Sequence, residues 1–176
     1  MSLILSTFLL VMAMGTQVIF DFNSGSDTQG WRTVDDDVMG GRSSSDFTIS
    51  EDGYGLFEGS VSLENNGGFS SLRYRFNKTQ IDKNGKVVLK VKGDGKKYQF
   101  RIKKSSSDYH SYIHNFETSG EWEEIEIPLN VFYPSFRGMK LDIPNFAHND
   151  IEEIGLLIGN KKAEKFSLLI DKIEIK

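Results

Sequence analysis

The chain of 176 residues contains no cysteine, and it has only three prolines and three histidines. The missing cysteines exclude disulfides, thiolate catalysis and cysteine-ligated zinc. The three histidines are scattered and no GxSxG elbow is present, so neither a nucleophilic triad nor a histidine metal site has support. We therefore expect a protein that is not an enzyme and that has no cofactor.

Concentrated positive charge and long apolar runs are also missing. The 21 lysines and arginines are spread along the chain, and the net charge is −4. A nucleic-acid-binding domain usually carries a basic patch or stripe, so we expect no nucleic-acid partner. The apolar run Leu3–Met14 has 12 residues, whereas a membrane span needs about 20. We therefore expect no transmembrane span.

Residues 1–16 form an apolar N-terminal segment that has two interpretations. Its length suits the apolar region of a secretory signal peptide, and Ala13-Met14-Gly15 places small residues where a signal peptidase cleaves. The basic start of such a peptide is missing, and a buried strand or helix is the alternative. A signal peptide predicts an exported, periplasmic protein, whereas an uncleaved segment predicts a cytoplasmic one.

The rest of the chain has mostly a period of two. Many aromatic residues and 17 glycines fit a β protein with tight turns. Apolar and polar side chains alternate within Phe69–Phe76 and again within Tyr98–Lys103. Such segments recur at hairpin spacing, which favours a sandwich or barrel of about nine or ten strands over βαβ units. Residues 17–176 are therefore predicted to form a single all-β domain. The predicted strands are Val18–Phe22, Phe47–Ser50, Tyr54–Leu63, Phe69–Phe76, Lys86–Val91, Tyr98–Lys103, Tyr109–Phe116, Trp122–Ile127, Ile154–Ile158 and Phe166–Ile175.

The densest motif is Asp35–Ser45. Its three adjacent carboxylates, Asp35, Asp36 and Asp37, precede two glycines, Gly40 and Gly41, which permit unusual backbone angles or close approach of another group. Arg42 follows, and its guanidinium could pair with an aspartate of the same loop or bind a carboxylate or phosphate. The loop is interpreted as structural, with a ligand or partner surface and a catalytic acid/base pair as the alternatives.

A second motif runs from Asn66 to Arg73. Asn66, Gly67 and Gly68 are typical of a hairpin turn. The functional alternative is the rim of a sugar or peptide site, because Asn66 and Arg73 can bind hydroxyl groups and Phe69 can stack on a sugar ring.

A third pattern is distributed over the polar faces of two strands. Arg73 and Arg75 lie on one of them, and Gln99, Arg101 and Lys103 lie on the other. If the strands are neighbours, these side chains form a polar ribbon. The ribbon is either a solvated face or a concave ligand surface, which Tyr112 in a following strand could border.

Two acidic residues stand among apolar neighbours in the terminal strands. A buried carboxylate needs a partner, so Asp21 and Asp171 are expected to pair with lysine or arginine. A structural calcium site made with backbone carbonyls is the alternative, and no other metal is expected.

Several segments, in one order, carry a resemblance to a known family. They are DDVMGGRSSS (Asp36–Ser45), NGGFSSLR (Asn66–Arg73), KGDGKKYQFRI (Lys92–Ile102), SYI (Ser111–Ile113), WEEIEIPLNVF (Trp122–Phe132), FRG (Phe136–Gly138), IGLLIGNK (Ile154–Lys161) and FSLLIDKIEI (Phe166–Ile175). Through these segments the chain resembles the complex I intermediate-associated protein 30 family over nearly everything after Gln17. Leu3–Met14 departs from the pattern of mitochondrial members, because it lacks the arginine-rich amphipathic character of a transit peptide.

The resemblance implies a jelly-roll β-sandwich that is related to galactose-binding domains. Mitochondrial members of the family act as assembly factors that bind intermediates of respiratory complex I. We therefore expect a non-catalytic binding or adaptor domain with a protein partner, and the alternative is a carbohydrate-binding module of a bacterial envelope protein. The sequence makes no prediction of oligomeric state. The expected binding surface comprises Asp36, Asp37, Gly40, Gly41, Arg42, Asn66, Gly67, Gly68, Phe69, Arg73, Arg101 and Tyr112, with Arg42 and Arg73 making charge-assisted hydrogen bonds.

Overall fold

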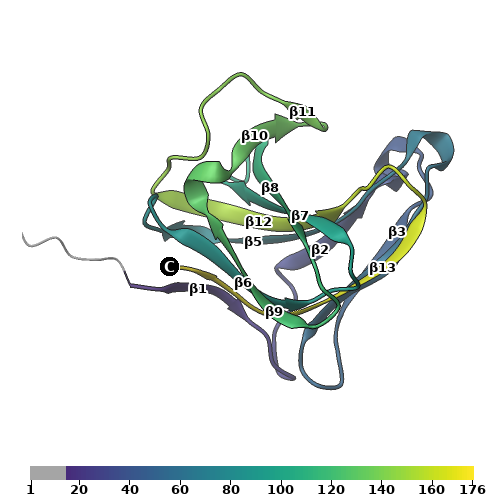
Figure 1. Cartoon of the computed structure of the whole chain (residues 1–176), viewed down its shortest axis with the longest axis horizontal. Coiled ribbons are helices and arrows are strands. Elements are labelled where there is room, and N and C mark those ends of the chain that lie inside the picture. The colour runs from purple at the N-terminus through teal and green to yellow at the C-terminus, as the bar shows by residue number, and fades with distance from the viewer. Residues whose placement is uncertain (1–14) are drawn as a thin grey trace, which may run out of the picture.

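A computed structural model describes residues 15–176 (Figure 1). The two interpretations of the apolar N-terminal segment concern residues that lie almost entirely outside this range. Within it, the chain forms a β-sandwich of two antiparallel sheets, and no helix there is long and apolar enough to cross a membrane.

The elements follow one another along the chain as thirteen strands and three short 3-10 turns. They are β1 (Gln17–Asp21), β2 (Trp31–Asp35), η1 (Asp36–Met39), β3 (Ser44–Ile49), β4 (Gly55–Val61), η2 (Glu64–Asn66), β5 (Ser70–Gln80), β6 (Lys86–Lys92), β7 (Lys97–Lys103), β8 (Ser111–Glu117), β9 (Trp122–Pro128), η3 (Leu129–Val131), β10 (Tyr133–Phe136), β11 (Met139–Lys140), β12 (Asp150–Ile158) and β13 (Glu164–Ile175).

The two sheets differ in strand order and share one core. The first has the order β3-β4-β13-β6-β9, with β1 added beside the C-terminal half of β13. The second has the order β11-β10-β8-β7-β12-β5-β2. Figure 1 shows the two sheets facing each other, with the β10–β11 hairpin rising from one side of the seven-stranded sheet. The predicted jelly-roll sandwich is thereby confirmed.

Alternation along the strands separates the core from the outer faces. In β7, Tyr98, Phe100 and Ile102 are buried, and the polar residues between them are partly exposed. Because successive side chains of a strand point to opposite faces, the alternate residues of β7 form part of the outer surface of the seven-stranded sheet. The core packs as one cluster that draws on both sheets.

The predicted strands all occur, but three short ones were not predicted. β2 adds at the edge of the seven-stranded sheet, where Trp31 enters the core. β10 contains Pro134, which has no backbone N–H to donate. A proline therefore argues against predicting a strand at this position from the sequence. This strand is only four residues long and lies next to the edge strand β11, where one missing donor is tolerated.

The strand β12 is central, as its apolar sequence indicates, and its pairing with β5 contains a bulge. The register shifts between Ile151, opposite Thr79, and Glu153, opposite Arg75, so the extra residues lie on β5. Across this irregularity Ile151 and Ile154 both enter the core, although residues three positions apart face opposite sides of a regular strand. From Glu153 onward, the odd-numbered residues of β12 face outward, between the polar residues of β5 and β7.

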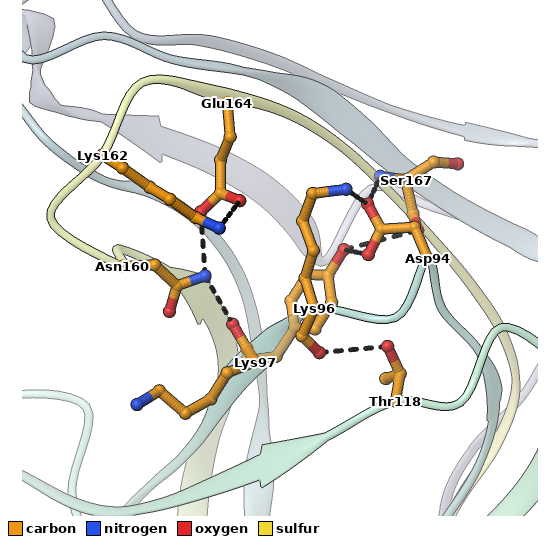
Figure 2. A network of polar contacts seen from close by, with 9 residues as sticks. Asp94, Lys96, Lys97, Thr118, Asn160, Lys162, Glu164 and Ser167 are labelled. Carbon is orange, nitrogen blue, oxygen red and sulfur yellow. Dashed lines mark hydrogen bonds and ion pairs between the residues drawn. The ribbon is translucent and has the colours of Figure 1, made fainter.

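One polar network ties the two sheets together at the β6–β7 connection (Figure 2). The carboxylate of Asp94 accepts hydrogen bonds from the buried Tyr98 hydroxyl at 2.9 Å and from the Ser167 amide of β13 at 3.0 Å. Lys96 pairs with the same carboxylate at 2.6 Å. Thr118 and Asn160 donate to the carbonyl groups of Lys96 and Lys97, which extends the network along the edge of the sandwich.

Substitutions in this network should separate its buried hydrogen bonds from its ion pair. Asp94→Ala leaves the Ser167 amide and the Tyr98 hydroxyl without their carboxylate, and we expect the free energy of unfolding to fall by about 1–3 kcal/mol. Lys96→Ala removes a partly exposed ion pair and should cost less than about 1 kcal/mol. Urea unfolding of both variants measures the difference, and equal losses would contradict this assignment.

Candidate ligand-binding groove

A groove of about 740 Å³ lies on the outer face of the seven-stranded sheet. Its floor comes from β5, β12, β7 and β8. The β10–β11 hairpin and Tyr109 form one wall, and the Gly68-Phe69 and Gly159–Lys161 segments lie at the other side. The lining residues are Gly68, Phe69, Arg73, Lys97, Tyr98, Gln99, Arg101, Lys103, Tyr109, Ser111, Asn115, Tyr133, Ser135, Phe136, Arg137, Gly138, Leu157, Gly159, Asn160 and Lys161.

The strand register determines which side chains meet on the groove floor. Gly155 of β12 is aligned with Arg73 of β5 on one side and with Arg101 of β7 on the other. The same row continues to Ile113 of β8 and Tyr133 of β10. The predicted polar ribbon thus exists on one face, but its two strands are not neighbours, because β12 separates them.

Aromatic side chains form the wall beside the β10–β11 hairpin. Tyr109 is 66% exposed although its ring packs edge-on against Phe136, with ring centroids 5.3 Å apart. The guanidinium of Arg137 lies 5.3 Å from the centre of the Phe136 ring, and Lys140 lies over Tyr133. An exposed aromatic wall of this kind offers a stacking surface to a ligand.

Two groove residues have positive φ angles, which residues other than glycine rarely adopt. The φ angles are +49° at Arg137 and +59° at Lys161. Such strain costs roughly 1–3 kcal/mol per residue and gathers at functional sites. Both residues stand in tight turns, and each turn places a cation on the groove.

The groove is basic, although the chain as a whole is acidic. Six cationic residues contribute to the lining, which contains no aspartate, glutamate or histidine. They are Arg73, Lys97, Arg101, Lys103, Arg137 and Lys161. A concave surface with one sign of charge attracts ligands of the opposite sign.

One carboxylate lies just beneath this basic surface. Glu153 is only 4% exposed, and its Oε2 accepts from the Nε of Arg75 at 2.6 Å. The guanidinium of Arg32 is 3.8 Å from the same oxygen. A buried carboxylate needs such partners, and Glu153 therefore uses the charge of Arg75 and Arg32.

Burial perturbs the cations that remain on the groove floor. Burial, assisted by repulsion from Arg73, lowers the pKa of Arg101 to about 10. Burial also lowers the pKa values of Arg73 and Lys103. Each of these groups is therefore held in a setting that disfavours its charge.

The buried carboxylate of Asp36 joins the two predicted loop motifs. It accepts four hydrogen bonds between 2.5 and 3.2 Å, from the amide and hydroxyl of Ser43 and from the amides of Gly68 and Phe69. Gly68 and Phe69 line the groove, so Asp36 positions one of its ends. A Cβ atom at Gly41 or Gly67 would overlap this carboxyl, which explains a glycine at both positions.

The structure divides the predicted binding residues into four groups. Gly68, Phe69, Arg73 and Arg101 line the groove. Asp36, Gly41 and Gly67 form the buried junction of the two loops, and Asp37, Gly40, Arg42 and Asn66 are exposed around it. Tyr112 faces the core, where its hydroxyl meets Nε2 of His148 at 3.1 Å. Arg42 pairs with Glu64 rather than with an aspartate of its own loop.

Sequence reasoning did not assign the hairpin wall of the groove. Tyr133, Ser135, Phe136 and Arg137 come from a segment that was not predicted to be a strand. The FRG segment was noted only for its resemblance to the family. The segment Tyr133–Arg137 combines aromatic residues, a proline and an arginine, but apolar and polar residues do not alternate in it. A strand prediction that depends on this alternation therefore does not find the segment.

The residues considered for calcium are paired with lysines. Asp171 lies 2.6 Å from Lys90, and Asp21 lies 3.3 Å from Lys172. No cluster of three or more histidine, aspartate or glutamate side chains that could hold a metal ion occurs among residues 15–176. The arrangement fits the ion-pair interpretation of both residues.

Comparison with known sequences decides the family. The sequence profile of the complex I intermediate-associated protein 30 family (CIA30) matches residues 20–170. The chain belongs to the CIA30 family. Two curated relatives are "Complex I intermediate-associated protein 30, mitochondrial" from Drosophila melanogaster, 25% identical over 90% of this chain, and its namesake from Mus musculus, 22% identical over 90%.

These CIA30 relatives correct one expectation from the sequence. Their names place them in mitochondria, which contradicts the prediction of an exported, periplasmic or cytoplasmic protein. That prediction relied on the apolar N-terminal run, which is a weak indicator of compartment without a basic start. The chain spans 62% and 56% of the length of these two relatives.

A solved structure with the same fold is the family 11 carbohydrate-binding module of Clostridium thermocellum, which was determined with a β-1,3-1,4-mixed-linked tetrasaccharide. The TM-score is 0.68 at 17% identity, and the match covers 93% of this chain and 96% of that one. At this identity the likeness shows a common jelly-roll fold and nothing about the ligand of the CIA30 chain.

The hydrogen bonds to the Asp36 carboxylate should make the free energy of unfolding depend on pH in the acidic range. Burial alone would raise the pKa of Asp36, but the Ser43 hydroxyl and the amides of Gly68, Ser43 and Phe69 together hold it below 3.8, the ordinary value. Because the folded pKa is the lower one, the stabilisation is fully present above about pH 4 and is lost as the pH falls through the folded pKa.

Asp36→Asn tests both the junction and its titration. We expect the free energy of unfolding at pH 7 to fall by about 2–3 kcal/mol, because an amide cannot accept all four hydrogen bonds. The loss of stability on acidification below about pH 4 should also become shallower. Urea titrations across this pH range measure both effects. The exposed neighbour gives the control, Asp37→Asn, and equal behaviour of the two variants would refute the assignment.

Proposed function

We propose that this CIA30 chain is a non-catalytic adaptor whose groove binds an extended segment of a partner protein. The observation that carries the proposal is the basic groove with its aromatic wall, in which exposed Tyr109 packs on half-buried Phe136. Aromatic side chains and arginine are the residue types that contribute most to protein–protein binding energy. The family name associates its members with complex I intermediates, and we propose an intermediate of respiratory complex I as the source of the segment.

The composition of the groove supports binding rather than catalysis. General acid–base chemistry usually requires histidine, aspartate or glutamate within reach of the substrate. The groove lining has none of these, and Glu153, which lines the small hollow on its floor, is buried and held by Arg75 and Arg32. Its serines, Ser111 and Ser135, have no histidine beside them in the lining to act as a base.

Carbohydrate binding is the second candidate function, and specific side chains favour it. The groove contains the amides of Gln99, Asn115 and Asn160, and Tyr109 offers an exposed ring for stacking. Amide groups and aromatic rings are suited to sugar hydroxyls and sugar faces. The charge of the groove distinguishes the candidates, because six cations are of little use for a neutral sugar.

The adaptor proposal is tested by recovering partners with the tagged full chain from its own cells. We expect respiratory complex I subunits in the wild-type sample and at least about tenfold less of them with Tyr109→Ala/Phe136→Ala, since buried aromatic anchors dominate binding energy. Trp122→Ala is the control, because Trp122 is a partly exposed aromatic that packs on Tyr54 at the other sheet. Quantitative mass spectrometry of the three samples gives the comparison.

Two results would reject parts of this proposal. Equal recovery of complex I subunits with the groove variant would place the partner surface elsewhere. Calorimetric binding of the mixed-linked tetrasaccharide that Tyr109→Ala abolishes would replace the protein segment by a carbohydrate.

A further inference from the structure

Two arginines on the groove floor have no ion pair with an acidic side chain among residues 15–176. Within this range the Arg73 side chain makes no hydrogen bond or ion pair, and the Arg101 side chain donates only through its Nε to the Gln99 amide oxygen at 2.7 Å. Both side chains are half-buried, and they repel each other. A guanidinium carries five donors, so most of their hydrogen-bonding capacity is unused.

Neighbouring charges relieve this arrangement only in part, because the Glu153 carboxylate favours the charged forms of both arginines but forms an ion pair with neither. Glu153 is the nearest carboxylate, and Arg75 and Arg32 already hold its Oε2. Lys103 donates to the backbone carbonyl of Asp108. The charge of the row that contains Glu153 is thus largely paired, and the row that contains Arg73 and Arg101 is not.

Gly155 keeps the space between the two arginines open. It is the residue of β12 that lies between Arg73 and Arg101, and a Cβ atom there would lie 3.7 Å from Arg73 Cγ and 3.8 Å from Arg101 Cβ. A hollow of about 10 Å³ lies at this point, lined by both arginines, Gly155, Lys103, Ser111 and Glu153. Such a volume accommodates about one water-sized group, for example a single ligand oxygen.

A buried hydroxyl on the groove wall also lacks a partner. Ser135 is 4% exposed, lines the groove and faces Ser111 in the register of β10 and β8. Among the described residues, its Oγ has no hydrogen-bond partner. Buried polar atoms are almost always paired, and this unpaired hydroxyl belongs to a residue that lines the groove.

We propose that the groove binds an acidic segment and holds one of its carboxylates between Arg73 and Arg101, above Gly155. This inference rests on the proposed function and specifies the chemistry of the segment. Two guanidinium forks match the planar carboxylate, and an anion would offset the repulsion between them. Glu153 at the side of the hollow favours a singly charged carboxylate over a doubly charged phosphate.

The first test uses the free protein and needs no ligand. Arg73→Gln removes one of two repelling, unpaired charges, so the urea midpoint should stay the same or rise. Arg75→Gln removes the closest partner of the buried Glu153, so the midpoint should fall. A fall with Arg73→Gln as large as that with Arg75→Gln would mean that Arg73 is a structural residue, and it would overturn the proposal.

The second test uses acetate as the carboxylate probe. Sodium acetate is titrated against sodium chloride at equal ionic strength, and the side-chain Nε–H resonances of Arg73 and Arg101 are followed by NMR. We expect saturable shifts of both resonances in the wild-type chain. With Arg73→Gln, the acetate affinity measured at Arg101 should fall at least about tenfold, as for the loss of a charged hydrogen bond. Arg42→Gln, outside the groove, should leave the affinity unchanged.

Each other outcome of this titration overturns the proposal. Shifts that do not saturate, or that persist with Arg73→Gln, exclude a carboxylate site at this pair. Tighter binding of inorganic phosphate than of acetate assigns the site to phosphate instead. These failures are distinct from failure of the adaptor proposal, which depends on the aromatic wall: loss of partner with Tyr109→Ala/Phe136→Ala but no acetate site would leave the groove intact and remove only its carboxylate specificity.

Discussion

The carboxylate of Asp36 is the interaction on which the groove end of this sandwich depends. The chain crosses from the seven-stranded to the six-stranded sheet after β2, and it crosses back after β4. Asp36 starts the first crossing and binds amides of the second, Gly68 and Phe69. The Ser43 hydroxyl donates to Asp36 and accepts from the Ser62 amide, so four backbone positions share one buried acceptor system. Because a buried carboxylate without donors is costly, the loops fold around it together.

The groove follows from the same geometry together with the order of strands. Asp36 places Phe69 at one side, and Phe136 of the β10–β11 hairpin, with Tyr109 packed against it, lies at the other. Between these sides, β12 separates the polar rows of β5 and β7, and Gly155 contributes no side chain at the centre. The groove floor is therefore open between Arg73 and Arg101, the two arginines whose charges form no ion pair among the described residues.

Much of the architecture was predictable from the sequence. Alternation identified β5 and β7. β12 and β13 lie inside their sheets, and their runs of apolar residues on both faces are typical of such central strands. The missed strands, β2, β10 and β11, are short edge or near-edge strands in which few residues alternate and one is proline. The apolar N-terminal run misled the prediction of compartment, because hydrophobicity alone does not specify an address.

The sequence by itself determined the fold class, the family and the residue types that the loops require. Local pattern is sufficient there, because alternation and turn chemistry act between residues that are close in the chain. Only the tertiary structure decided that Asp36 is a buried junction, that Tyr112 faces the core, and that Arg73 and Arg101 share a row across Gly155. These relations depend on the order in which distant strands pair, and sequence spacing carries no information about that order.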